Sequence, residues 1–304
     1  MEFQQLRYLV AVAETENFTR AAERCHVAQP SLSQQIIKLE RELGHKLFHR
    51  LGRRAVMTEA GMVFLQRARR MLLELDDATR EMRDSDQIDR SITVGTIPTL
   101  APTLLPPLLA LCKTRFPQLE VNATEDFRDD LIQGVIDGRL DLAIMALPVA
   151  DPRLDSEALF SEPLLLAVGK SHPLASKSKV EVEDIKAERF VMMGSRSTLA
   201  AEIRRFCGDE QFEPRIAYHC AQIATVKALV AQGVGITILP KGTITAEDRA
   251  RIISKPLLGR NPARDIGIIR HQSRYQSRGA EQFLSVLRAH TKASGLPRNE
   301  EPTR

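Results

Sequence analysis

The sequence predicts an α/β protein with an N-terminal winged helix-turn-helix, a long linker helix and a two-lobed α/β domain. Three observations carry this prediction. Short helical patterns and a basic segment occupy residues 1–58, one long helical seam occupies 59–90, and alternating strand and helix patterns then occur twice over 91–304. The chain has 304 residues, which exceeds the usual length of one domain, so several folding units are expected.

The composition is that of an ordinary globular protein, with 43% hydrophobic and 27% charged residues. No apolar run approaches the ~18 residues that a membrane helix needs. Glu2, Arg7 and Glu14 interrupt the stretch where a signal peptide would be apolar, so a cytoplasmic protein without a membrane partner is expected. The four cysteines form no C-x-x-C pair and no metal-ligand spacing with the seven histidines. We therefore expect buried thiols, with no disulfide, metal or cofactor.

The first 45 residues predict three helices. Apolar residues from Phe3 to Ala13 recur at helical steps, and a short second helix is expected from Thr19, as a possible N-cap, to a point before Val27. Pro30 suits the first turn of a third helix, because its missing N–H would have no partner there. The buried stripe of that helix is expected to be Leu32, Ile36, Leu39 and Leu43.

The exposed face of the third helix and the segment after it predict a DNA-reading surface. The helix face is polar, and Leu47–Arg54 predicts a hairpin that turns at Gly52 and carries arginines. From Gln29 to Arg54 the six Lys and Arg residues and two Glu residues give a net charge of +4. Helix-turn-helix proteins offer such side chains to the major groove, and wing arginines reach phosphates; the alternative is a solvated face. The candidate DNA contacts are Gln29, Pro30, Ser31, Ser33, Gln34, Lys38, Arg50, Arg53 and Arg54.

A long helix is predicted to begin at Thr58. Its apolar residues follow alternating steps of four and three, which is typical of the seam of a coiled coil, while the flanks are charged. We expect dimerisation through this seam, although packing of the helix on its own domain is an alternative. The seam consists of Phe64, Ala68, Met71, Leu75, Ala78 and Met82.

Beyond the charged stretch 84–90, strands and helices alternate, which predicts a mostly parallel α/β sheet. Two similar lobes are expected, lobe I from about 91–164 and 266–290 and lobe II from about 165–265. The chain would cross between them near 165 and 265, and the tail from Thr291 is expected to be mobile. Open α/β sheets bind ligands beyond the carboxyl ends of their strands, so the cleft between lobes is the expected small-molecule site.

The chain resembles the LysR-type transcriptional regulators over nearly its whole length. The N-terminal residues that match the family's spacing are Phe18, Ala21, Ala22, Gln29, Pro30, Ser31, Leu32, Ser33, Ile36, Leu39, Glu40, Leu43, Gly44, Leu47, Phe48, Arg50, Thr58, Ala60 and Gly61. The resemblance implies a two-lobed domain of the periplasmic-binding-protein-like (type II) fold. It also implies binding to double-stranded DNA at an imperfect inverted repeat, to a small-molecule effector, to further copies of the chain as a homodimer or homotetramer, and to RNA polymerase. Ala28 departs from the pattern, since the family often has Ser or Thr there to cap the recognition helix.

The effector half resembles in particular the family's peroxide sensors. The matching residues are Ile97, Pro98, Thr99, Leu104, Leu105, Pro106, Phe116, Pro117, Gly235, Ile236, Thr237, Leu239 and Pro240. By this resemblance Cys207 corresponds to the second redox cysteine, whereas Thr198 stands in place of the peroxide-reactive one. A threonine hydroxyl cannot form a sulfenic acid or a disulfide. A thiol-responsive regulator therefore remains only the alternative function.

Hydroxyl groups and one arginine are expected to replace that chemistry. Thr198 begins a helix whose N–H groups and dipole favour an anion, and Arg128 begins another helix and could supply a counter-charge. Each hydroxyl alone could be an ordinary helix cap. The candidate effector-binding residues are Thr96, Pro98, Thr99, Arg128, Ser195, Ser197, Thr198 and Gln222, and the predicted effector is a small anion.

Two other functions compete with a ligand-responsive regulator. An enzyme is disfavoured because the chain has no G-x-S-x-G, P-loop, G-x-G-x-x-G or metal motif, and an enzyme would not need the winged segment. No catalytic residue is therefore assigned. A nucleoid-type DNA-binding protein would leave more than half of the chain unexplained.

Overall fold

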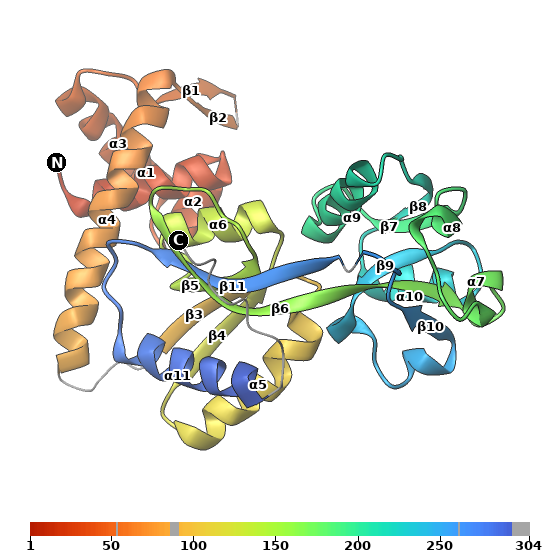
Figure 1. Ribbon diagram of the computed structural model, residues 1–304. Helices are drawn as coiled ribbons and strands as arrows, with labels where there is room; N and C mark the ends of the chain where they lie inside the picture. Colours follow the sequence, from red (N-terminus) through yellow and green to blue (C-terminus); the bar gives the residue numbers. More distant parts are fainter. Residues whose placement is uncertain (53, 86–90, 261, 294–304) are drawn as a thin grey trace. The chain divides into compact units, whose positions relative to one another are not determined.

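The computed structural model describes residues 1–52, 54–85, 91–260 and 262–293 (Figure 1). The chain forms two compact units, Met1–Ile88 and Asp89–Arg304, and each is described by itself. We call them the N-terminal unit and the C-terminal unit.

The N-terminal unit contains three short helices, a two-stranded wing and a long helix. Its elements are α1 (Phe3–Thr15), α2 (Phe18–Arg24), α3 (Gln29–Leu43), β1 (Phe48–Leu51), β2 (Arg54–Met57) and α4 (Glu59–Ser85). The expected cap of α2 was wrong, because Asn17 and not Thr19 accepts the free N–H groups, those of Thr19 and Arg20. The wing strands pair antiparallel around Gly52, whose φ of 61° is readily adopted by glycine.

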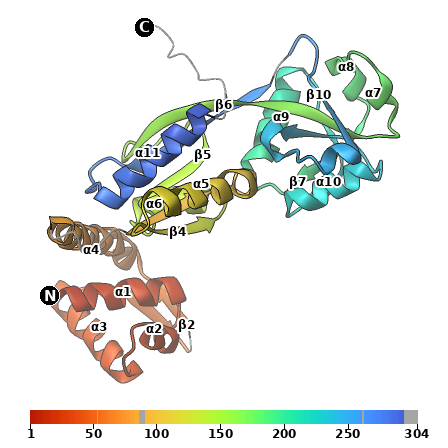
Figure 2. The same cartoon turned by 90° about the horizontal axis from the view of Figure 1, so that it is seen from below.

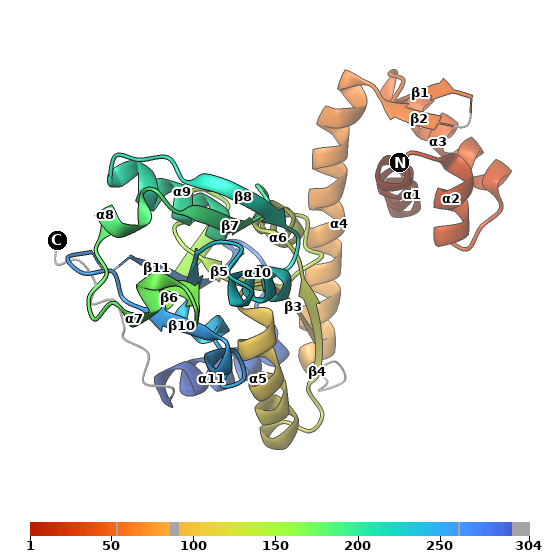
Figure 3. The ribbon, with the colours of Figure 1, turned by 90° about the vertical axis from the view of Figure 1, so that its right-hand side faces the viewer.

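The long helix α4 begins after Thr58, whose hydroxyl accepts the N–H of Gly61 at 2.9 Å. Figure 3 shows α4 beside α1, and the two helices pack together. The expected seam is not one continuous surface. Ala68 is fully buried in the core of its own unit and Phe64 packs against that core, whereas Met71, Ala78 and Met82 are exposed and Leu75 is half-buried. At Phe64 and Ala68 the structure therefore favours the alternative, packing of the helix on its own domain, over a dimer seam.

The C-terminal unit has a mixed α/β architecture. Its elements are β3 (Ser91–Thr96), α5 (Ala101–Arg115), β4 (Glu120–Glu125), α6 (Arg128–Ile136), β5 (Leu142–Ala146), β6 (Leu154–Gly169), α7 (Pro173–Ser176), α8 (Val182–Ile185), β7 (Arg189–Met193), α9 (Thr198–Asp209), β8 (Arg215–Cys220), α10 (Ile223–Ala231), β9 (Thr237–Pro240), η1 (Lys241–Thr243), η2 (Asp248–Ala250), β10 (Ile252–Lys255), β11 (Ala263–His271) and α11 (Arg278–Ala293). The predicted tail from Thr291 begins inside α11, and residues 294–304 lie outside the described part.

Lobe I is built around β3, which pairs in parallel with β4 on one side and β5 on the other. The chain leaves β3 toward β4 through α5 and returns to β5 through α6, so the two helices cover opposite faces of the sheet. Figure 1 shows α11 beside α5 on the face opposite α6, and the two helices are in contact. The carboxyl end of β3 is therefore a switch point in strand order, where α/β proteins form ligand sites.

Lobe II has a second, smaller parallel pair, β7 with β8. The long strands β6 and β11 pair antiparallel and join the lobes; both are labelled in Figure 1, and Figure 2 shows β6 from below. The large sheet that contains β6 and β11 therefore has both parallel and antiparallel pairs, whereas a mostly parallel sheet was expected. Two separate apolar cores form, one from residues between 92 and 160 together with 266–287, the other from residues between 164 and 257. Two cores connected by two strands leave an interface between the lobes.

Candidate DNA-binding and effector-binding sites

The outer face of α3 is polar and exposed in its N-terminal half. Pro30, Ser31, Gln34 and Lys38 are exposed, and Gln29 is half-buried. Ala28 is the N-cap residue of α3 and makes no side-chain cap bond, so the cap that the position would normally supply is missing. Backbone N–H groups at this helix start are therefore free to meet a phosphate.

Ser33 differs from the prediction, because it is buried and does not face outward. Its hydroxyl accepts a hydrogen bond from Arg50 at 2.9 Å, and the Arg50 guanidinium also lies 4.5 Å from the ring centre of Phe18. Ser33 therefore positions a wing arginine and is not an exposed group on the helix face. Ser33 directly follows Leu32 and precedes Ile36 by three residues, so it lies at the edge of the buried face, where periodicity alone leaves its orientation ambiguous.

The wing is held by an ion pair at Arg54 and by backbone hydrogen bonds at its base. Exposed Arg54 donates to Glu16 at 2.6 Å, while Arg53 lies outside the described residues. At the base of the wing the Glu40 carboxylate is buried and accepts the N–H groups of Leu47 and Phe48, at 2.9 and 3.3 Å. Glu40 therefore fixes the wing to α3. The net charge of the segment, in which Glu40 was counted, did not reveal this role.

The candidate effector pocket lies between the lobes, where β3 and β4 end and α6 and α9 begin. Five of the eight predicted residues line it: Pro98, Thr99, Arg128, Ser197 and Thr198. Ile97, Phe127 and Leu199 complete the lining. These apolar residues were not predicted, because a site search by polar residue types passes over the walls of a pocket.

This pocket is nearly closed, with a volume of about 10 Å³, enough for about one water molecule. Beside its lining, Arg196 of lobe II pairs with Asp130 of lobe I, and its guanidinium lies 4.7 Å from the ring centre of Phe127. The lobes are therefore in contact through this pair, next to the pocket.

Three predicted residues are not brought into the pocket. Thr96 is fully buried, and its hydroxyl donates to the carbonyl of Ile144 at 3.2 Å, so it serves the sheet. Ser195 and Gln222 are exposed and lie outside the pocket lining. Proximity to a helix start in sequence did not place their side chains at the site.

Arg128 does line the pocket, but it does not bond to the threonines as expected. Its guanidinium donates to the carbonyls of Ala146 and Pro148, and burial lowers its pKa. A guanidinium has five N–H donors, so these two bonds leave others for a ligand. Arg128 is thus a partly desolvated, oriented cation at the edge of lobe I.

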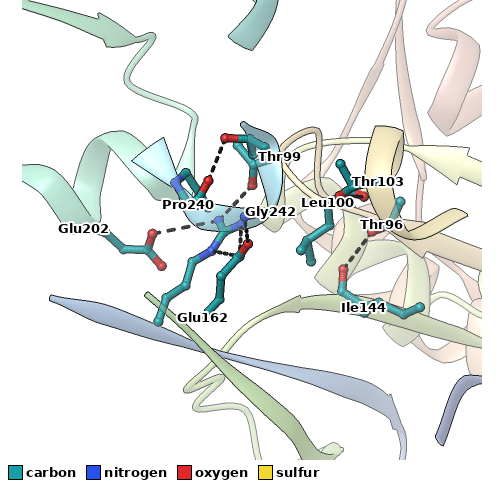
Figure 4. Close-up of polar contacts among 11 residues, drawn as sticks. Thr96, Thr99, Leu100, Thr103, Ile144, Glu162, Glu202, Pro240 and Gly242 are labelled. Atoms are coloured by element: carbon teal, nitrogen blue, oxygen red, sulfur yellow. Dashed lines mark hydrogen bonds and ion pairs between the residues drawn. The ribbon is translucent and has the colours of Figure 1, made fainter. Parts of the chain in front are cut away.

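The expected partner of Arg128, Thr99, accepts a hydrogen bond from Arg264 at 2.8 Å (Figure 4). Arg264 is almost wholly buried and donates twice more to the buried Glu162 carboxylate, from Nε at 2.9 Å and from NH2 at 2.8 Å. Glu162 also accepts the N–H of Gly242 in lobe II at 2.9 Å. This ion pair joins the crossover strands β6 and β11 and connects both lobes to the pocket.

A second cavity of about 190 Å³ adjoins the first, sharing Arg128 and Thr198 with it. Its remaining lining is Leu147, Pro148, Ala201, Glu202 and Arg205. Glu202 lies one turn after Thr198 on α9, and Figure 4 shows it facing the same guanidinium that Glu162 binds. Burial raises the pKa of the Glu202 carboxyl, and neighbouring Arg264 and Arg205 oppose that shift.

Glu162, Glu202 and Arg264 were not among the residues predicted from the sequence. A signal existed for the first, since Glu162 interrupts a strand between the core residues Phe160 and Leu164. Charged residues inside apolar strands are seldom buried unless they are paired. The pairing itself spans 102 positions and had no local pattern.

Cys207 and Cys220 are both buried in the core of lobe II. Burial raises the pKa of Cys207 to about 12. The thiolate is the reactive form, so this thiol is poorly suited to react with peroxide at neutral pH.

The described residues lack two features that mark other protein classes. No described helix has both the length and the apolar content needed to cross a bilayer. Within the same residues, no group of three or more His, Cys, Asp or Glu side chains is placed to hold a metal ion.

Comparison with known families matches both units. Residues 3–62 match the family described as bacterial regulatory helix-turn-helix protein, lysR family, and residues 85–292 match the LysR substrate binding domain. The chain is 34% identical to the DNA-binding transcriptional dual regulator OxyR of Escherichia coli K12 over 293 residues, which cover 95% of each chain.

Two solved structures are also similar. A full-length OxyR variant from Pseudomonas aeruginosa has a TM-score of 0.77 and 26% identity, covering 100% of this chain and 99% of that one. Full-length CbnR in complex with its target DNA has a TM-score of 0.66 and 28% identity, covering 95% and 99%.

Proposed function

Because the chain belongs to the LysR family of bacterial helix-turn-helix regulators and is a DNA-binding transcriptional regulator with an effector-binding domain, we propose that it binds an imperfect inverted repeat and responds to a small effector held between its lobes. The observation that carries the proposal is the combination of an exposed polar face on α3 with a polar pocket at the switch point of lobe I. An enzyme or a simple nucleoid protein would need only one of the two.

Base reading is assigned to α3. Gln29, Ser31 and Gln34 would meet base edges or nearby phosphates, Pro30 shapes the helix start, and Lys38 would meet the backbone. Gln34→Ala should weaken binding to the operator by roughly 1 to 3 kcal/mol without affecting random DNA. Lys38→Ala, the matched variant, should weaken binding to both DNAs and lower the salt slope by about one. Unchanged operator affinity of Gln34→Ala would remove this helix as the reader.

The wing is assigned to phosphate binding. Arg50 is oriented by Ser33 and Phe18, and Arg54 by Glu16, so both guanidinium groups are held in place with donors to spare. Arg53 is proposed for the same role from the sequence alone.

Self-association is assigned to the part of α4 that its own domain leaves uncovered. The uncovered residues with the spacing of a coiled-coil seam are Met71, Leu75, Ala78 and Met82. A buried unpaired charge is strongly destabilising. Leu75→Glu should therefore release monomer and abolish operator binding, whereas Gln66→Glu on the same helix should not. A persisting Leu75→Glu dimer in sedimentation would move the interface elsewhere.

The effector is proposed to carry an anionic group bound at Arg128. Charge-assisted hydrogen bonds to a guanidinium are stronger than neutral ones. Binding shifts the lobes only by the ligand's differential affinity for one arrangement, with coupling of typically about 1 to 3 kcal/mol. Arg128→Ala should abolish the response to effector and leave effector-free DNA affinity intact.

A thiol signal is the second candidate, favoured by the OxyR relatives. The high pKa of Cys207 and the threonine at the start of α9 oppose it. Cys207→Ser should therefore change little. Loss of a peroxide response in this variant would establish the thiol signal instead.

The remaining assignments follow from regulation of transcription. A protein that binds chromosomal DNA in bacteria acts in the cytoplasm, and its effect on transcription would pass through contact with RNA polymerase. We expect it to act by binding alone, without catalysing a reaction or holding a cofactor.

A further inference from the structure

The Glu202 side chain is a buried carboxylate that lacks a full set of partners. It is only 9% exposed, and its Oε2 atom has no hydrogen-bond partner within the described part of the chain. Buried polar atoms without partners are costly and few in folded proteins. Glu202 lines the 190 Å³ cavity between the lobes, so its carboxyl group lies at the cavity wall, with Oε2 itself shielded from solvent.

The neighbouring cations do not complete the site. Arg264 approaches Glu202 Oε2 only to 4.0 Å, because its donors serve Glu162 and Thr99. Arg205 is exposed, and within the residues described it has no ion pair at 4.0 Å or less with Glu202. Glu202 therefore offers an acceptor oxygen that the protein leaves unused.

Arg128 offers the complementary group on the other side of the same cavity. It belongs to lobe I, whereas Glu202 belongs to lobe II, and both line the cavity without a described ion pair between them. A ligand that carried only negative charge would satisfy Arg128 but would place a like charge near Glu202. A ligand with a cationic donor as well would satisfy both.

We propose that this pocket selects a small zwitterion of the amino-acid class, whose carboxylate binds Arg128 and whose ammonium group binds Glu202. The inference rests on the proposed effector function and narrows its ligand. An ammonium group has three N–H donors and no acceptor, which matches an unpaired carboxylate oxygen. Such a ligand would connect the two lobes through one charge-assisted contact on each side.

The experiment compares amino acids with the matched acids that lack only the amine, by calorimetry on the full chain. The pairs are L-alanine with propionate, L-valine with isovalerate, L-aspartate with succinate, and L-phenylalanine with hydrocinnamate. At least one amino acid should bind about tenfold or more tightly than its partner acid, the size expected for a charged hydrogen bond.

Variants of the protein test the contact to the amine and the contact to the carboxylate separately. Glu202→Gln should remove the preference for the amine, while Glu183→Gln, an exposed change elsewhere in lobe II, should preserve it. Arg128→Ala should weaken both members of a pair. Thermal melting of each variant confirms that it is folded.

Two outcomes would contradict the inference in different ways. If an acid binds as tightly as its amino acid and Arg128→Ala abolishes that binding, Glu202 does not recognise an amine, although the anion pocket stands. If no probe binds, or if Arg128→Ala leaves binding unchanged, both the inference and the proposed pocket fail.

Discussion

The crossover strands and the first turns of α9 each place a buried glutamate near Arg264, and the two carboxylates are held differently. Glu162 receives two hydrogen bonds from the Arg264 guanidinium and one from the backbone N–H of Gly242. Glu202 approaches the same arginine only to 4.0 Å, and its Oε2 atom has no hydrogen-bond partner within the described residues. The comparison separates a carboxylate that joins the lobes from one that remains available to a ligand.

The largest effect should come from breaking the satisfied pair. Arg264→Met leaves Glu162 buried without its partner, which should lower the free energy of unfolding by about 3 to 5 kcal/mol. Urea denaturation measures this loss. The double variant Glu162→Leu with Arg264→Leu removes both charges and should lose less. An Arg264→Met variant as stable as the parent would mean that Glu162 finds another partner or water.

Removing the charge of Glu202, which lacks a hydrogen-bond partner at Oε2 in the described part of the chain, should instead raise the free energy of unfolding. The pKa of Glu202 is raised in the folded protein, so the folded state holds the proton more tightly than the unfolded state does. Stability from this group is therefore full below the ordinary pKa of 4.5 and falls as the pH rises from there through the folded-state pKa.

Glu202→Gln cannot titrate, so it should raise the free energy of unfolding by about 1 kcal/mol or more at neutral pH. The gain should vanish in acid. Thermal melting of parent and variant across pH provides the measurement. A destabilised variant at neutral pH would show that the carboxylate is satisfied in solution.

Two helix starts in the N-terminal unit show a similar contrast between polar groups that have a side-chain partner and polar groups that lack one. Asn17 caps α2 through two backbone N–H groups, whereas Ala28 at the start of α3 offers no side-chain acceptor. Ala28→Ser should stabilise the unit by about 1 kcal/mol, and Asn17→Ala should destabilise it by a similar amount. Melting temperatures that do not move in opposite directions would contradict this assignment of the caps.

The smallest effect should come from the exposed pair between the lobes. Arg196 and Asp130 are 63% and 44% exposed, in contrast to the buried pair of Arg264 with Glu162. Exposed ion pairs contribute about 0 to 1 kcal/mol, so Arg196→Ala should barely change the urea midpoint. A loss as large as that of Arg264→Met would show that exposure does not distinguish the two pairs.

Local pattern was sufficient for most elements. The strand periodicity of the sequence predicts strands at 92–97, 119–124, 141–147, 190–193 and 215–219, which correspond to β3, β4, β5, β7 and β8, because strand and helix periodicities differ and depend only on neighbours in sequence. The predicted strand 164–168 covers only the second part of β6, which begins at Leu154, since the polar residues of its first part show no apolar alternation. Family resemblance supplied the function, while the end of the first strand indicated Thr99 and two helix starts indicated Arg128 and Thr198, and all three line one pocket.

Only the tertiary structure decided which polar groups those neighbours meet. The sequence places Ser33 on a helix, Arg264 on a strand and Glu202 one turn after Thr198, yet it does not say that Ser33 holds Arg50 or that Arg264 spends its donors on Glu162. Such pairings join residues far apart in the chain, and whether a charge is satisfied depends on which side chains reach it after packing. Periodicity determines the face on which a residue lies, whereas the partner on that face is set by the fold as a whole.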